Sequence, residues 1–540
     1  MYNCLSVLCI FLVCWQPTPS CGEALCQVEQ SYCWRKHFGK NFGRAWETQL
    51  TAALVWFRRD LRLTDNPALS HALNDRQQII PVFVHAPEEY GTWTPGAASN
   101  WWLHHSVTAL AAALSKRGSR LVVRCGSSIE TLRQLISQCG ARRVYWNRCY
   151  EPALQRRDKA VETALEDLGI LCFKFNGSLL YEPGSLQSGA GRPFRVFGAF
   201  WKACQRLPPQ PEPLPAPRRL PPVAPDLQSV SIEALQLLPR PRWDAGLTQA
   251  WTVGEQAAAA RLAEFVSGAL KDYPTLRDRP DTFGTSRLSP HLHFGELSPR
   301  QIFHAINQWQ AVTPSAGSIR ATEAFLRELG WREFAYHLLH HFPQTPDRPL
   351  DSRFEGFPWS RDYLDALRSW QRGRTGYPII DAGMRELWSM GWMHNRVRMI
   401  AASFLVKNLR VPWVEGERWF WDTLVDADLA NNTLGWQWSA GCGADAAPYF
   451  RIFNPILQGR RFDPDGTYVR KWVPELATLP AKSIHQPWVA GAPTLRRHGI
   501  VLDRDYPPPL VDLSESRRHA LEGFQSIKTS PRKLPPGRVP

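Results

Sequence analysis

Five short apolar runs near the start of the chain constrain its fold more than any other feature. They are LVWF (54–57), IIPVFV (79–84), LVVRC (121–125), RVYW (143–146) and LCFKF (171–175). Helix-length segments such as 100–117 and 129–139 separate them. Runs of this length with few polar residues are typical of strands buried on both faces. Their alternation with helices predicts a doubly wound parallel sheet, and hence an α/β domain.

The pattern changes further along the chain. Nine prolines lie between residues 207 and 225, which predicts a stiff, extended connector. After Trp251 the strand signal ends and helical periodicity continues to about residue 510, which predicts an all-α second domain. We therefore expect the following parts: an extension (1–50), an α/β domain (51–183), a connector (184–250), a helical domain (251–513) and a basic tail (514–540).

Composition narrows the class of protein. Lys and Arg number 64 against 49 Asp and Glu, a net charge of +15, which favours a polyanion such as nucleic acid as partner. Many basic proteins nevertheless bind no nucleic acid. A hydrophobic content of 44% excludes a wholly disordered chain. No uncharged apolar stretch reaches about 18 residues, so no ordinary membrane-spanning helix is expected.

The first fifty residues differ from the rest. Six of the twelve cysteines lie within the first 33 residues, and the other six are scattered singly, as in a reduced cytoplasmic protein. Residues 5–15 could be the apolar core of a signal peptide, but no basic residue precedes them. The alternatives are an unstructured extension and a start codon assigned too far upstream.

Residues 271–299 carry several hydroxyls, contributed by Tyr273, Thr285, Ser286 and Ser289. One interpretation is that the serines before prolines only cap helices. The other is a phosphate cradle made from hydroxyls and helix N-termini, with Gly284 allowing close approach of the backbone.

A helical segment from residue 328 places Glu328, Trp331 and Arg332 on adjacent faces. Trp331 is either a packed aromatic beside a surface ion pair or a wall for a flat ligand, with Glu328 as its hydrogen-bonding carboxyl.

Two further segments combine charges of opposite sign. Asn395, Arg396 and Arg398 share little more than one helical turn, which suits recognition of phosphate or carboxylate at an exposed rim. Asp426 and Asp428 could bind a metal or act in acid–base chemistry, but no third ligand lies nearby, so no metal is expected. Pairing of Asp426 with Arg398 is the favoured interpretation.

Together the segments GTSRLSPHLHFGELSP, WMHNRVRM and DAAPYFRIFNP resemble the photolyase/cryptochrome flavoprotein family. The resemblance covers residues 52–513 and begins with LVWFRRDLRLTDNPAL, which is similar to the family's first strand and following loop. It is closest to microbial cyclobutane pyrimidine dimer photolyases, the branch that neighbours plant cryptochromes. It implies an α/β antenna domain and an all-α domain that binds FAD.

The resemblance also implies a set of cofactor contacts. Asn432 would face flavin N5, and Arg398 would pair with Asp426 beside the ring. The residues implied to bind FAD are Tyr273, Thr285, Ser286, Arg287, Leu288, Ser289, Arg398, Asp426, Ala427, Asp428 and Asn432.

The lesion pocket is implied in the same way. Glu328 would hydrogen-bond to the bases, and Trp331 and Trp438 would form an aromatic wall. The residues implied to contact DNA are Arg277, Glu328, Trp331, Arg332, Asn395, Arg396, Met399, Trp438 and Gln458. Trp436, Trp413 and Trp359 match the family's electron-relay tryptophans, whereas the spacing before Trp370 departs from the usual pattern.

We therefore expect a blue-light enzyme that splits cyclobutane pyrimidine dimers by electron transfer from excited reduced FAD. The rivals are a cryptochrome-type sensor, a (6-4) photolyase and a DNA-binding scaffold. Asn147 and Glu151 are candidate antenna contacts, and methenyltetrahydrofolate is expected rather than a deazaflavin. The expected partner is damaged DNA, with a monomeric protein in the cytoplasm and no membrane.

Overall fold

The computed structural model describes residues 52–75, 77–189, 191–446 and 451–528. The predicted extension (1–50) and the residues that follow 528 lie outside the described residues. Within them, 52–528 belong to one compact unit. No helix among the described residues is long and apolar enough to cross a membrane.

The five predicted strands form one parallel sheet. They are β1 (Ala52–Phe57), β2 (Gln78–His85), β3 (Val122–Cys125), β4 (Arg143–Asn147) and β5 (Leu171–Phe175), in the order β3-β2-β1-β4-β5. The register aligns Leu54 of β1 with Ile80 on one side and Val144 on the other. The fold class predicted from the apolar runs is confirmed.

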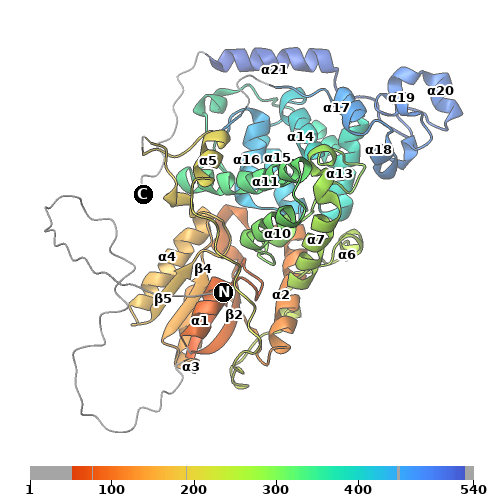
Figure 1. Cartoon of the computed structure of the whole chain (residues 1–540). Helices are drawn as coiled ribbons and strands as arrows, with labels where there is room; N and C mark the ends of the chain where they lie inside the picture. Colours follow the sequence, from red (N-terminus) through yellow and green to blue (C-terminus); the bar gives the residue numbers. More distant parts are fainter. Residues whose placement is uncertain (1–51, 76, 190, 447–450, 529–540) are drawn as a thin grey trace, which may run out of the picture. The chain divides into compact units, whose positions relative to one another are not determined.

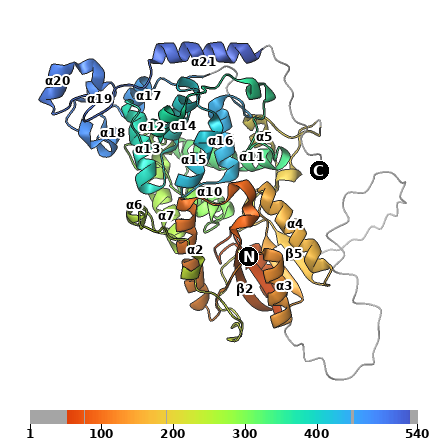
Figure 2. The same ribbon diagram turned by 180° about the vertical axis from the view of Figure 1, so that it is seen from behind.

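Both faces of the sheet are covered, because successive strand residues point to opposite sides. Leu54 and Trp56 pack with residues of α3 (Ser128–Cys139) and α4 (Pro152–Glu166), whereas Val55 and Phe57 pack with α1 (Pro67–Asn74) and α2 (Ala97–Ser115). Figure 1 shows α1 in front of the sheet, and Figure 2, seen from behind, shows α3 in front of it.

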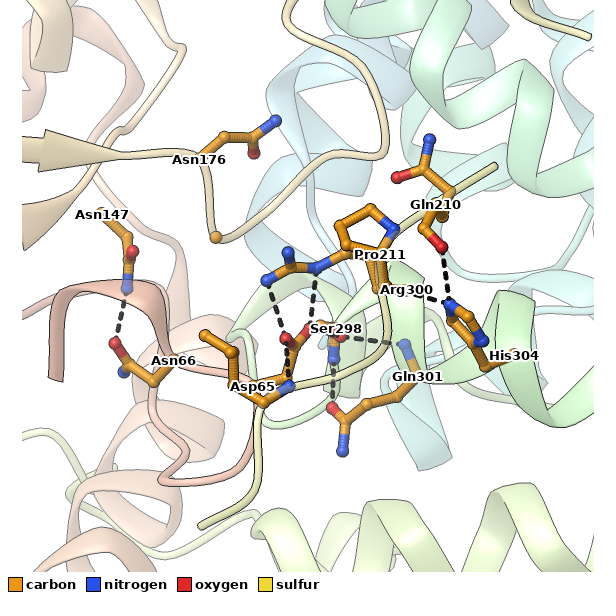
Figure 3. A network of polar contacts seen from close by, with 12 residues as sticks. Asp65, Asn66, Asn147, Asn176, Gln210, Pro211, Ser298, Arg300, Gln301 and His304 are labelled. Atoms are coloured by element: carbon orange, nitrogen blue, oxygen red, sulfur yellow. Dashed lines mark hydrogen bonds and ion pairs between the residues drawn. The ribbon is translucent and has the colours of Figure 1, made fainter. Parts of the chain in front are cut away.

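The connector packs against the sheet domain. It contains α5 (Phe197–Cys204) and α6 (Ala245–Ala250), and no helix between 207 and 225. Leu220 joins the core on one face of the sheet and Val223 the core on the other. Figure 3 shows how His304 meets the carbonyls of Gln210 and Pro211, at 3.1 and 2.9 Å.

A buried aspartate ties the sheet domain to both the connector and the helical domain. Asp65 is fully buried and pairs with Arg300 at 2.7 Å, and the Ser298 hydroxyl donates to it at 2.5 Å (Figure 3). Asp65 also exchanges backbone and side-chain hydrogen bonds with Leu214. The sheet therefore has a defined position relative to the helices that carry the site.

After the connector, the regular secondary structure of the described residues is helical, as predicted, apart from an isolated bridge between Leu502 and Tyr506. The helices are α7 (Glu255–Ser267), α8 (Tyr273–Leu276), α9 (Ser289–His293), α10 (Pro299–Val312), α11 (Ala316–His341), α12 (Leu364–Gln371), α13 (Pro378–Met390), α14 (Asn395–Ser403), α15 (Trp413–Thr423), α16 (Leu429–Ala440), α17 (Pro455–Phe462), α18 (Thr467–Trp472), α19 (Ala481–Ile484), α20 (Ala492–Arg497) and α21 (Leu513–Lys528). The largest core lies among α13, α14, α15 and α16.

The predicted basic tail (514–540) begins with a packed helix, since α21 covers its first half. Ser516, Ala520, Gly523 and Ile527 are its buried residues, at three- and four-residue spacing, and Asn408 donates to the Ser516 hydroxyl at 2.9 Å. This amphipathic spacing is typical of a packed helix. The other domain boundaries stay predictions.

Candidate active site

The hydroxyl-rich segment forms a tight turn before α9. A Cβ on Gly284 would lie 2.6 Å from the Leu276 backbone oxygen, so only glycine permits this approach. The Thr285 and Ser286 hydroxyls hydrogen-bond to no other described group. Arg287 has φ +52°, a conformation that non-glycine residues rarely adopt and that often marks a functional site.

The Arg287 side chain is a cation without a carboxylate partner among the described residues. Its guanidinium lies 4.6 Å from the Trp392 ring centroid, and burial lowers its pKa. Leu288 is buried beside it and Tyr273 is buried one helix earlier. A largely buried positive charge next to two unused hydroxyls fits an anionic group such as a diphosphate.

An ion pair joins this segment to the helices that follow. Arg398 of α14 donates from Nη2 to both carboxylate oxygens of Asp426, at 2.9 and 3.1 Å, as predicted. The Ser289 hydroxyl donates to Asp426 at 2.6 Å. Residues 289, 398 and 426, far apart in the sequence, therefore meet at one place, and buried Ala427 lies next to it.

Asp428 caps α16 by accepting a hydrogen bond from Asn431 N at 3.0 Å. Tyr336 donates its hydroxyl to the same carboxylate, and His293 lies 3.5 Å away. Burial alone would raise the pKa of Asp428, but His293 and the charge of Arg332 hold it well below its usual range. Asp428 is therefore a charged group committed to internal partners.

Asn432 is held by α15. Its Nδ2 donates to the Glu417 backbone oxygen at 3.0 Å, which leaves Oδ1 to accept from a ligand N–H. The Glu417 side chain is fully buried, accepts from Thr433 at 2.7 Å, and has a pKa that burial raises well above its usual value. A neutral amide at this position suits a ring that gains and loses a proton.

These residues fit FAD. The unused hydroxyls and unpaired Arg287 suit the diphosphate, and the Asn432 oxygen suits an N–H of the flavin. FAD would supply the electron chemistry, whereas the protein residues bind and orient it.

A cavity of about 520 Å³ lies beside this site. Met399 of α14 and Trp438 of α16 both line it, with Phe453. Glu328, Trp331 and Asn395 do not line it. Trp331 stacks on Phe197 with ring centroids 3.8 Å apart, an arrangement that adjacent sequence could not reveal. The predicted pocket is thus brought together only in part.

The same cavity is lined by cations that the sequence analysis missed. Arg195 comes from the connector, Arg353 from the segment between α11 and α12, and Lys407 follows α14. Burial lowers the Lys407 pKa to about 7. No local pattern marks these residues, because they meet only through the packing of segments distant in sequence.

The residues expected to contact DNA fall into two groups. Arg277 and Arg396 are partly exposed and each pairs with an acid, and Gln458 is half-buried on α17. Arg332 differs from them: it is only 9% exposed and donates to the Ser178 backbone oxygen at 2.8 Å, so its contact with DNA stays a prediction.

The predicted relay tryptophans lie around the core of the helical domain. Trp436 is buried with ring centroids 5.0 Å from Phe420 and 6.1 Å from Trp370. Trp413 is buried at the start of α15, and half-buried Trp359 contacts Phe357. Among the described ring contacts, the tryptophan nearest Trp436 is Trp370, whose assignment the sequence left in doubt.

The two residues predicted to contact an antenna chromophore are bound to other side chains of the sheet domain. Asn147 is buried and donates to Asp60 at 2.6 Å and to Asn66 at 2.9 Å, the latter visible in Figure 3. Glu151 is buried and pairs with Arg59. Both are buried in the sheet domain with internal partners, and their contact with a chromophore stays a prediction.

Comparison with known proteins agrees with this geometry. Residues 53–218 match the DNA photolyase family model, and residues 325–526 match the FAD binding domain of DNA photolyase. A deoxyribodipyrimidine photo-lyase of Agrobacterium fabrum is 46% identical over 88% of this chain and 98% of its own length. Cryptochrome-2 of Arabidopsis thaliana is 41% identical over 86% of this chain and 77% of its own length.

A solved structure extends the likeness to three dimensions. A bacterial class III photolyase from Agrobacterium tumefaciens has a TM-score of 0.85 and 45% identity, covering 89% of this chain and 98% of that one. Fold and site thus define a two-domain flavoprotein with an α/β domain and an FAD-binding helical domain. The chain belongs to the photolyase/cryptochrome family.

Proposed function

We propose that this protein is a deoxyribodipyrimidine photo-lyase, which splits cyclobutane pyrimidine dimers in DNA by electron transfer from excited reduced FAD. One observation carries the proposal. On α14, Arg398 belongs to the cofactor site and its neighbour Met399 lines the cavity. On α16, Asn432 likewise belongs to the cofactor site, and Trp438, further along the same helix, lines the cavity. A base in the cavity would therefore lie close to the flavin.

The chemistry of the cavity suits a flipped, damaged base. Aromatic faces such as Trp438 contribute roughly 1–3 kcal/mol per stacked base. A damaged base leaves the duplex more easily than an intact one. Arg195 supplies positive charge for a phosphate, whereas Arg353 pairs with Asp351 at 2.7 Å and buried Lys407 donates to the Arg451 backbone oxygen. By its place in the family's motif, Glu328 would hydrogen-bond to the bases although it does not line the cavity here, and Arg398 and Asn432 would hold the flavin.

Two rivals are weaker. A light sensor needs the cofactor but has no use for a basic, aromatic-lined cavity of this size. A (6-4) photolyase would need two catalytic histidines in its pocket. His394 is buried, accepts from Arg396 N at 3.2 Å, and has a pKa that burial lowers to about 4. It is therefore committed to capping α14.

We also propose methenyltetrahydrofolate as the antenna rather than a deazaflavin. Doubly wound sheets bind flat ligands where the strand order reverses, here between β1 and β4. That crevice is filled by Arg58, which pairs with Asp158 at 2.6 Å and covers the Trp56 ring at 4.3 Å. A chromophore has to bind outside it. We expect a monomer that acts on dimer-containing DNA in the cytoplasm.

The test uses two oligonucleotides, one with a cyclobutane dimer and one with a (6-4) lesion, exposed to blue light with the reduced, FAD-loaded protein. Loss of the cyclobutane dimer alone is expected. Repair of the (6-4) lesion, or of neither, would refute the proposal.

A further inference from the structure

Two ion pairs occupy Arg277 and Arg396, two of the three arginines that the sequence predicts to contact DNA. Arg277 donates from Nη1 to Glu328 Oε1 at 2.6 Å. Arg396 donates from Nη2 to Asp278 Oδ1 at 2.8 Å. The four side chains are between 19% and 37% exposed, so DNA can reach them. The segment that follows α8 is thus tied to α11 and α14 at once.

The two acids differ in what else they can bind. Glu328 is proposed to hydrogen-bond to the bases of the lesion, so it has another partner when a dimer enters. Asp278 has no proposed contact with the lesion. A guanidinium binds carboxylate and phosphate through the same planar N–H groups. A DNA phosphate therefore competes with Glu328 for Arg277.

We propose that Arg277 and Glu328 exchange partners when a dimer binds, Arg277 turning to a phosphate and Glu328 to the bases. Undamaged DNA leaves the pair closed, because opening it would leave the Glu328 carboxylate beside a phosphate without a hydrogen-bond donor. One phosphate contact thus depends on a base in the pocket. This inference rests on the proposed repair function.

The exchange has a measurable signature in the salt dependence of binding. Each neutralised phosphate of duplex DNA contributes about 0.9 to the slope of log affinity against log salt. The slope for dimer DNA should therefore be steeper than that for undamaged DNA by about 0.9. In Glu328→Gln, Arg277 is free for both DNAs, so the slopes should converge and undamaged DNA should bind several-fold more tightly.

Asp278→Asn is a matched control, since it removes one negative charge from the second of the two ion pairs. It frees Arg396 for both DNAs, so it should raise both affinities by the same factor and leave the slope difference unchanged. Asp505→Asn, which alters the exposed pair with Arg504, should change neither affinity.

The experiment measures fluorescence anisotropy in the dark on FAD-loaded protein, between about 50 and 200 mM salt. The two duplexes differ only in a thymine dimer, and flavin absorbance checks the folding of each variant. Arg277→Gln should also abolish the slope difference. Equal slopes in the wild-type protein, or equal shifts for both DNAs in Glu328→Gln, would overturn the exchange. A wild-type protein that does not prefer dimer DNA would instead refute the proposed function.

Discussion

Replacing Gly416 with alanine tests how closely α15 holds Trp436, one of the three predicted relay tryptophans. The added Cβ would lie 2.1 Å from Trp436 Cη2 and 2.4 Å from its Cζ3, so the ring or the helix must move. Trp436 is only 2% exposed and is confined by Phe420 and Trp370. Overpacking of this kind typically costs about 1–3 kcal/mol.

Alanine is also the better helix former, by about 1 kcal/mol. The net loss in the free energy of unfolding should therefore be up to about 2 kcal/mol. Gly435→Ala on α16 is the matched control, because a Cβ there meets nothing within 4 Å and the site is exposed. It should stabilise the protein by about 0.5–1 kcal/mol.

The assay is urea unfolding followed by flavin release, together with the rate of flavin photoreduction. Gly416→Ala should lose stability and photoreduce more slowly, whereas Gly435→Ala should do neither. Equal stability of the two variants would refute the packing argument, and unchanged photoreduction in a destabilised Gly416→Ala would remove Trp436 from the relay.

Three further changes test other parts of the site. His394→Asn keeps a good N-cap but removes a histidine whose folded pKa, about 4, lies below its unfolded value. The unfolded wild-type chain binds a proton at His394 that the folded protein does not, so the wild-type free energy of unfolding falls as pH drops from about 6.5 to about 4. Over this range the variant should lose up to about 1.4 kcal/mol less per pH unit than the wild type, as measured by urea titration. A variant with the wild-type slope would contradict this. Trp413→Phe should block photoreduction of oxidised flavin by an external reductant but spare repair by reduced enzyme; unaltered photoreduction would place the relay elsewhere. Asp426→Asn leaves Arg398 without its carboxylate, so the purified protein should contain less FAD by absorbance, and full occupancy would argue against the ion pair's role.

The sheet was predictable because its strands are buried on both faces and therefore appear as continuous apolar runs. The order of the strands and the position of the connector were not, because they depend on contacts such as Asp65 with Arg300 across distant segments. Helix α21 was missed because its amphipathic spacing is followed by a basic, proline-rich end, and the whole range was interpreted as a tail.

The cofactor site was predictable residue by residue from long motifs, and the pairing of Arg398 with Asp426 also followed from charge. Burial was not. Arg332 follows Trp331 directly, yet its side chain turns inward to the Ser178 carbonyl. The cations of the cavity were missed because Arg195 and Arg353 come from segments far apart in the sequence rather than from a shared motif.

The most direct test of the repair function compares wild-type protein with Glu328→Ala at equal FAD occupancy, both reduced, under saturating blue light. Thymine released from cyclobutane dimers is counted by chromatography. Dimer splitting puts negative charge on the base oxygens, and losing one positioned donor typically costs a few kcal/mol. The wild type should restore thymine and the variant should restore distinctly less. A reduced, FAD-loaded wild-type protein that splits no dimer would contradict the enzyme assignment and leave the light sensor in its place.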